Sequence, residues 1–167
     1  MTWVRDYRAE WPNEKRTCWK PAVVSSLDVT KEVAEFLTSL GLPTTYDFYF
    51  NFAGFDNLPD WGKSGLRRLG SNGEYPILLE PLGEGSVWSV DAEGDLFLCN
   101  TGVSRFARCL LEMRLSQKLA LTPMSKGGFY GRVRELAERT LRRMQEIDPD
   151  ALGVKDSMWT DYCAGLF

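Results

Sequence analysis

The spacing of hydrophobic residues predicts a first helix between residues 29 and 40. Four apolar residues in this stretch recur at the i, i+3, i+4, i+7 spacing of one helix face: Val33, Phe36, Leu37 and Leu40. Asp28 or Thr30 can cap the start of this helix. Gly41 favours the left-handed conformation that ends a helix, and Pro43 prevents its continuation.

Two longer helices are predicted in the C-terminal half of the chain. The first follows a cap at Asn100 or Thr101 and places these apolar residues on one face: Val103, Phe106, Ala107, Leu110 and Leu111. Residues 122–128 contain one proline and two glycines, which break this helix. The second spans about residues 129–147 and has its own apolar face: Val133, Leu136, Ala137, Leu141 and Met144. Its opposite face is rich in arginine and glutamate, and Pro149 ends it.

The middle of the chain predicts strands. Residues 46–52 are aromatic and alternating, which is typical of a strand. Residues 53–73 are rich in Gly, Pro, Asp and Asn and predict a long loop. Residues 74–80 predict a further strand, in which Pro76 favours a sheet edge or the beginning of the strand.

The clearest pattern predicts a β-hairpin. Residues 86–91 and 95–100 alternate around a short turn, in which Gly94 can adopt the positive φ that a short hairpin loop requires. Trp88 alternates with valines in the first of these strands and is expected to pack in the core. A block of strands followed by helices predicts an α+β fold, a single domain with a mostly antiparallel central sheet flanked by helices.

The N-terminal segment, residues 1–27, has no clear period but contains Trp3, Trp11 and Trp19. Tryptophan side chains bury large apolar surfaces, so we expect this arm to pack on the main domain, residues 28–167.

The charge is unevenly distributed along the chain. The net charge is −3 over 167 residues, but residues 28–102 contain twelve acidic and four basic residues. This argues against a nucleic-acid binder, which needs a basic surface. Two interpretations stay open: a surface that attracts a cationic partner, or ordinary solvated loop acids. The first residues lack the apolar core of a signal peptide and no apolar run could span a membrane, so a cytoplasmic protein is expected.

The absence of histidine limits the chemistry of the chain. Catalytic triads that need histidine are excluded, so any enzyme would depend on carboxylates, lysine or tyrosine. The four cysteines have no metal-binding spacing and are expected to be buried or half-buried thiols: Cys18, Cys99, Cys109 and Cys163. We therefore expect no catalytic residues, no metal and no cofactor.

Three partial motifs have simpler explanations. Residues 57–64 resemble the end of a phosphate-binding loop, but Asn57 replaces the first glycine and Pro59 removes a backbone donor. Residues 83–85 resemble the start of a dinucleotide fingerprint, but they lead into a strand instead of a helix. The hairpin carboxylates at 91, 93 and 95 lack the spacing of a calcium loop and are more typical of turn formation.

An acidic surface with one tryptophan is the candidate binding site. Trp61 either anchors an interface or packs beneath its own loop. The candidate partner-binding residues are Asp56, Asp60, Trp61, Glu84, Asp91, Glu93 and Asp95.

Several segments of the chain form a recognisable pattern. The first is Phe36-Leu37 followed by Gly41-Leu42-Pro43. The others are the hairpin through Val87–Asp91 and Phe97–Thr101, the helix with Phe106, and residues 147–152 followed by Met158 and Trp159. Together these segments resemble the SUKH superfamily, and within it the fourth immunity subfamily of bacterial toxin systems. The likeness covers about residues 30–160, whereas residues 1–27 match nothing in it and Cys99 replaces a more usual hydrophobic residue.

The resemblance implies a non-enzymatic antidote that binds a cognate toxin domain, often a nuclease or deaminase. A toxin that binds nucleic acid would be cationic, and it would be complementary to the acidic middle of this chain. Two other functions stay open: an intracellular regulator that binds peptides or proteins through the same scaffold, and a small carboxylate-dependent enzyme.

Overall fold

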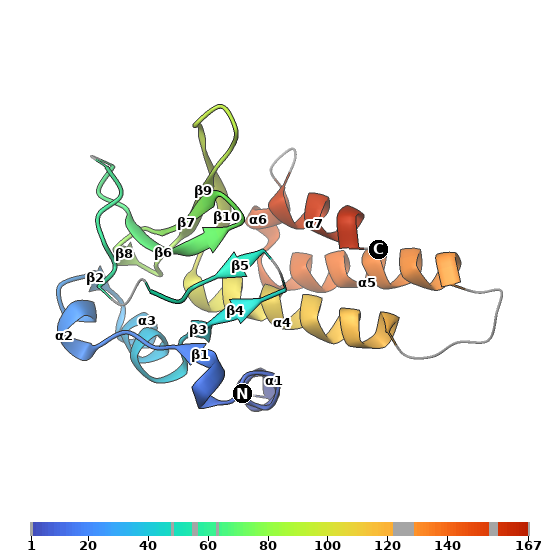
Figure 1. Ribbon diagram of the computed structural model, residues 1–167, viewed down its shortest axis with the longest axis horizontal. Coiled ribbons are helices and arrows are strands. Elements are labelled where there is room, and N and C mark those ends of the chain that lie inside the picture. The colour runs from blue at the N-terminus through green and yellow to red at the C-terminus, as the bar shows by residue number, and fades with distance from the viewer. Residues whose placement is uncertain are drawn as a thin grey trace.

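A six-stranded antiparallel sheet forms the centre of the protein (Figure 1). The computed structural model describes residues 2–47, 49–54, 57–62, 64–121, 129–153 and 157–166. The order of the strands across the sheet is β10, β9, β7, β6, β5, β4. Their bounds are β4 Thr45–Tyr46, β5 Phe50–Asn51, β6 Arg67–Asn72, β7 Tyr75–Leu79, β9 Val87–Val90 and β10 Leu96–Asn100.

Two small strand pairs lie outside the central sheet, and the first of them joins the N-terminal arm to the domain. β1 (Arg16–Thr17) pairs antiparallel with β3 (Leu42–Pro43), and β2 (Asp28–Val29) pairs parallel with β8 (Leu82–Gly83). Around them lie α1 (Thr2–Glu10), η1 (Asn13–Lys15), α2 (Pro21–Val24), α3 (Lys31–Glu35) and η2 (Phe36–Leu40).

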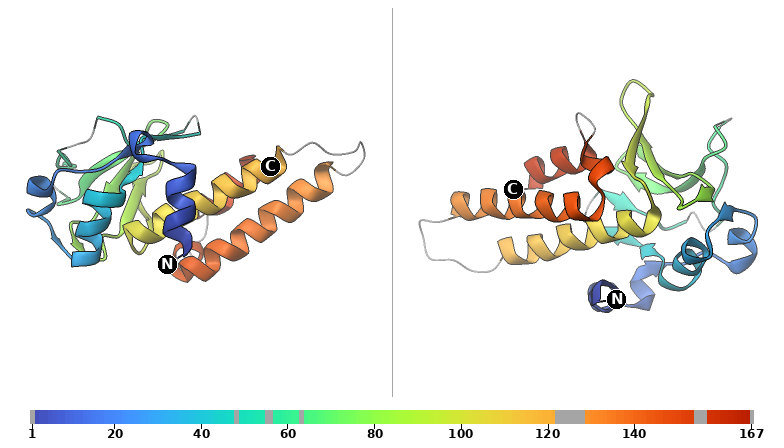
Figure 2. Two further views of the ribbon diagram at one scale, coloured as in Figure 1. Left: turned by 90° about the horizontal axis from the view of Figure 1, so that it is seen from below. Right: turned by 180° about the vertical axis from the view of Figure 1, so that it is seen from behind.

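The C-terminal helices are α4 (Val103–Ala120), α5 (Phe129–Ile147), α6 (Pro149–Leu152) and α7 (Met158–Leu166). α4 and α5 lie side by side, and their far ends extend beyond the sheet (Figure 2). These helices and the antiparallel sheet confirm the predicted α+β single domain.

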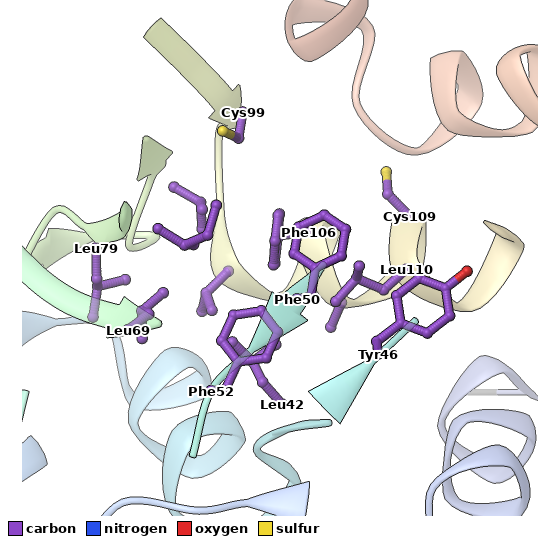
Figure 3. Close-up of a cluster of buried hydrophobic side chains, with 14 of the residues drawn as sticks. Leu42, Tyr46, Phe50, Phe52, Leu69, Leu79, Cys99, Phe106, Cys109 and Leu110 are labelled. Carbon is purple, nitrogen blue, oxygen red and sulfur yellow. The ribbon is translucent and has the colours of Figure 1, made fainter. Parts of the chain in front are cut away.

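The core lies between the sheet and α4 (Figure 3). Phe50 and Phe52 stack with their ring centroids 6.2 Å apart, and Phe106 of α4 meets Phe52 edge-on at 6.1 Å. All three side chains are fully buried. Burying a phenylalanine side chain contributes about 1.5–3 kcal/mol, so this cluster is a main source of stability.

The N-terminal arm contributes to the same core. Trp11 and Trp19 are buried, and the Trp11 ring lies 5.8 Å from that of Tyr46 in β4. The buried Tyr7 hydroxyl donates a hydrogen bond of 3.0 Å to the Gly41 carbonyl. The arm therefore packs against the domain, while a division at residue 28 stays a prediction.

The hairpin of β9 and β10, strand β7 and helix α5 lie where the sequence predicts them. Gly94 has φ +92° in the hairpin turn. β7 is an interior strand with Pro76 as its second residue, so of the two positions predicted for this proline the beginning of the strand is correct. The first helix also forms, with the Thr30 hydroxyl accepting from the Val33 amide, but its last turn, η2, is a π-helix.

One strand prediction and one loop prediction are wrong. In place of one strand over residues 46–52 there are two short antiparallel strands, β4 and β5, and Asp47, directly after β4, has φ +52°, which ends that strand. The predicted loop 53–73 contains β6, which pairs with β7 through a two-residue turn at Gly73. The half-buried Arg67 and Arg68 and an irregularity in the ladder after Arg68 obscure the alternation of this strand.

Trp88 departs from its predicted core position. Val87 and Ser89 face the core and are buried, so the alternation of β9 places the half-buried Trp88 on the opposite face of the sheet. There it is the cross-strand neighbour of Leu78 and Leu98.

A buried polar cluster replaces the predicted cap of α4, whose N-cap is Gly102. The carboxylate of Asp148, which is 1% exposed, accepts hydrogen bonds from the Asn100 side-chain amide (2.9 Å) and the Thr101 backbone amide (2.8 Å). The Trp159 indole donates to the Asn100 side-chain oxygen at 3.0 Å. Asn100 and Thr101 therefore join β10 to the C-terminal helices instead of capping α4.

Candidate functional site

A groove of about 860 Å³ lies between the ends of the sheet and α7. Four parts of the chain line it: Tyr49 after β4, the turn between β6 and β7, the hairpin of β9 and β10, and α7. We call it the hairpin–α7 groove and define it by four aromatic and four acidic residues: Tyr49, Tyr75, Phe97, Tyr162, Glu74, Asp91, Glu93 and Asp161.

The aromatic residues span the depth of the groove. Tyr49 and Tyr75 are 53% and 43% exposed, whereas Phe97 and Tyr162 are half-buried. Tyr49 and Tyr162 meet nearly at right angles, with their ring centroids 5.8 Å apart. Tyr162 also contacts the buried Phe50 at 5.2 Å, which fixes its ring against the core.

The charge of the groove is purely negative among the described residues. Among the described residues, its lining includes Glu74, Asp91, Glu93 and Asp161 but no lysine or arginine. Within the described part of the chain, none of these four carboxylates forms an ion pair. Four uncompensated negative charges around one concave surface create a potential that attracts cations.

The hydroxyl of Tyr162 is buried and has no hydrogen-bond partner in the described structure. Burial raises the pKa of Tyr162, and the nearby Asp47 and Tyr49 raise it further. The phenol therefore stays neutral at physiological pH and keeps both a proton to donate and lone pairs to accept.

The hairpin tip is held by its own hydrogen bonds. The Asp91 carboxylate accepts from the backbone amides of Glu93 (3.1 Å) and Asp95 (2.8 Å). Asp91 is thus a turn-forming residue, and the turn fixes the backbone position of Glu93.

Three of the seven predicted partner-binding residues lie on this tip. Asp91 and Glu93 line the groove, whereas Asp95 is exposed on the same turn and is not part of the lining. Asp56 lies outside the described residues.

The other three predicted residues lie elsewhere. Asp60 pairs with Arg67 at the beginning of β6, and the Arg68 guanidinium lies 5.6 Å from the ring centroid of the half-buried Trp61. β6 separates this position from the groove by about 17 Å, five residue steps of an extended strand. Glu84 is exposed beside α4, where its carbonyl accepts from the Val103 amide at 3.3 Å.

The sequence interpretation missed six groove residues: Tyr49, Glu74, Tyr75, Phe97, Asp161 and Tyr162. The Asn72-Gly73 pair is a strong hairpin signal that would have placed Glu74 and Tyr75 at a turn. No comparable signal places α7 beside the hairpin, because that contact joins residues about sixty positions apart.

A second pocket, of about 430 Å³, differs in charge. Its lining carries both signs of charge, with Glu10, Glu14 and Asp47 against Lys15 and Arg114. Glu10 is ion-paired with Arg114 at 3.4 Å and with Lys118 at 2.7 Å. Opposite charges therefore compensate each other there, and its pull on a charged partner is weaker.

Other kinds of site find little support in the described structure. Within it, no group of three histidine, cysteine or acidic residues could hold a metal ion. None of its helices has both the length and the apolar character needed to cross a membrane. All four cysteines are thiols, with Cys18 exposed and the other three buried.

Comparison with known protein families identifies the chain. The model of the SUKH-4 immunity protein family matches residues 8–165. The chain belongs to the SUKH-4 immunity protein family. The match confirms the resemblance inferred from the sequence and extends it through most of the N-terminal arm. No curated protein and no solved structure matched.

Within this SUKH-4 chain, two of the segments that carried the resemblance meet in the buried polar cluster. Asn100 and Thr101 end one segment, and Asp148 belongs to the other. These segments therefore hold the fold together, whereas the hairpin–α7 groove is built mainly from other positions.

Proposed function

We propose that this SUKH-4 protein is an immunity protein that binds a cationic toxin domain and neutralises it by covering its surface. The single observation that supports this is the hairpin–α7 groove, with four carboxylates that no described lysine or arginine neutralises. Membership of an immunity family supports a toxin as the partner, and the negative charge of the groove supports a partner with a positively charged surface.

The toxin we propose is a nuclease or deaminase acting in the cytoplasm. Enzymes that act on nucleic acid carry basic surfaces that bind the phosphate backbone. An acidic groove competes for such a surface, so binding alone is enough to block the enzyme. We propose no catalytic, metal or cofactor site in the immunity protein itself.

The test begins with the toxin domain encoded beside this protein in its genome. We expect cells that express the toxin domain to survive only when the protein is co-expressed, and the two purified proteins to form a stable complex. Turnover of a metabolite by the protein alone, lost on a single substitution in a pocket, would support an enzyme instead.

The contribution of the groove is tested with two triple variants of equal charge change. The groove variant combines Glu74→Gln, Glu93→Gln and Asp161→Asn, and leaves the turn-forming Asp91 intact. The control combines Glu32→Gln, Glu135→Gln and Asp150→Asn, which are exposed and lie outside the groove. We expect only the groove variant to lose affinity for the toxin, by at least about tenfold.

A further inference from the structure

The hairpin–α7 groove has the chemistry of a receptor for one particular side chain. We infer that it receives an arginine of the toxin together with the short segment of chain around it. This inference rests on the proposed function and names the group that the groove recognises. Charge, aromatic geometry and size each support it.

The carboxylates surround the groove from three directions. Glu74 belongs to the turn between β6 and β7, Glu93 to the hairpin tip and Asp161 to α7. A guanidinium group has five N–H donors in a planar fork, so it can bind carboxylates on more than one side. The three elements therefore offer acceptors to one cation in a way that a single acidic loop does not.

The aromatic rings favour arginine over lysine. The rings of Tyr49 and Tyr162 are 81° apart in orientation, and both residues line the groove, so two ring planes of different orientation lie beside it. A guanidinium stacks on aromatic faces and is less strongly hydrated than an ammonium group. The chain already uses this contact at its surface, where Arg68 lies over Trp61.

The size of the groove indicates a segment and not a single side chain. Its volume of about 860 Å³ lies in the upper part of the range typical of small-molecule pockets. The buried Met158 and the half-buried Phe97 add apolar surface for residues beside the arginine.

The experiment uses the intact protein and a blocked peptide, acetyl-Gly-Gly-Arg-Arg-Gly-Gly-amide, titrated by NMR. Two matched peptides replace both arginines with citrulline, which is neutral and nearly isosteric, or with lysine. We expect the arginine peptide to shift the ring signals of Tyr49 and Tyr162. It should bind about tenfold more tightly than the citrulline peptide and about threefold more tightly than the lysine peptide.

Variants show where the peptide binds. The groove triple variant should weaken binding of the arginine peptide about tenfold, and the control triple variant should leave it unchanged. Equal binding of the arginine and citrulline peptides, or binding that the groove variant does not weaken, would overturn the inference.

The toxin assay separates this inference from the proposed function. If the groove variant protects cells as well as the wild type does, the groove is not the receptor, although the immunity function stands. If the wild type fails to bind the neighbouring toxin, the proposed function is wrong, and the peptide titration still decides the chemistry of the groove.

Discussion

At the scale of single residues, Asp148 is a position whose loss should clearly lower stability. Asp148→Ala leaves the Asn100 side chain and the Thr101 amide without their acceptor in a buried site. An unsatisfied buried polar group costs about 1–3 kcal/mol, so we expect the free energy of unfolding to fall by about 3 kcal/mol. Urea denaturation measures this loss, with the exposed Asp150→Ala as control. Equal stability of the two variants would contradict the structural role of the cluster.

The buried cysteines predict a loss of stability in alkaline solution. Burial raises the pKa of the Cys109 and Cys163 thiols to about 12 and raises that of Cys99 as well. Above an ordinary thiol pKa of about 8.5, the unfolded chain loses protons that the native protein keeps, so the free energy of unfolding falls as pH rises. Each buried thiol should contribute a loss of about 1.4 kcal/mol at pH 9.5.

Urea denaturation at pH 7.5, 8.5 and 9.5 measures this effect, because tyrosines of the unfolded chain, with a pKa of about 10, begin to ionise only at the highest of these pH values. Cys109→Ala lowers stability at every pH because it leaves a cavity, but it should also make the dependence on pH shallower. A free energy of unfolding that stays constant up to pH 9.5 would show that the thiols are not protected.

At the scale of elements, the end of the helix formed by α3 and η2 depends on Gly41. Its φ is +68°, and a Cβ atom added there would lie 2.2 Å from the Thr17 carbonyl oxygen in the neighbouring strand. Gly41→Ala therefore combines backbone strain with a backbone clash, and we expect a loss of more than about 3 kcal/mol. Gly54→Ala is the control: its φ is +81°, but no atom lies within 4 Å of the added Cβ. That variant should lose only about 1 kcal/mol, measured by thermal or urea unfolding.

The elements also show how far the sequence alone could lead. Gly41, Gly94 and Pro149 mark ends and turns through their own backbone preferences, and the structure has boundaries at all three. β6 was missed because the half-buried Arg67 and Arg68 and the irregular ladder after Arg68 obscure its alternation of buried and exposed residues. The capping prediction for Asn100 failed because a partner 48 residues away, Asp148, takes its side chain. Local patterns predict local structure, but they carry no information about such distant partners.

At the scale of the whole molecule, the candidate site is a product of the fold. Its lining runs from Tyr49 to Gly165, and only the packing of α7 against the sheet brings these segments together. The acidic excess of residues 28–102 was visible in the sequence, but the sequence did not show which of these carboxylates are paired with basic residues and which are not. Asp60 is neutralised by Arg67, whereas Glu93 forms no ion pair within the described part of the chain and lines one groove with Asp161, which lies outside that range.

This division of charge leads to a prediction about association kinetics. An acidic groove would speed the encounter with the cationic toxin that we propose, and dissolved salt screens such an attraction. We expect the association rate constant of the wild type to fall about tenfold or more between 50 and 500 mM salt in a stopped-flow or surface-binding experiment. The groove triple variant should associate more slowly at low salt and depend less on salt, because the charges it lacks are those that face the partner.

The control triple variant has the same net charge as the groove variant, so it separates local from global electrostatics. If both variants slow association equally, the total charge of the protein steers the encounter, and the groove has no special part in it. If only the groove variant is affected, the carboxylates on the two turns and α7 act together at one surface. That surface exists only when α7 packs beside the hairpin, so a variant that loosens α7, such as Trp159→Phe, should weaken the salt dependence without removing a charge.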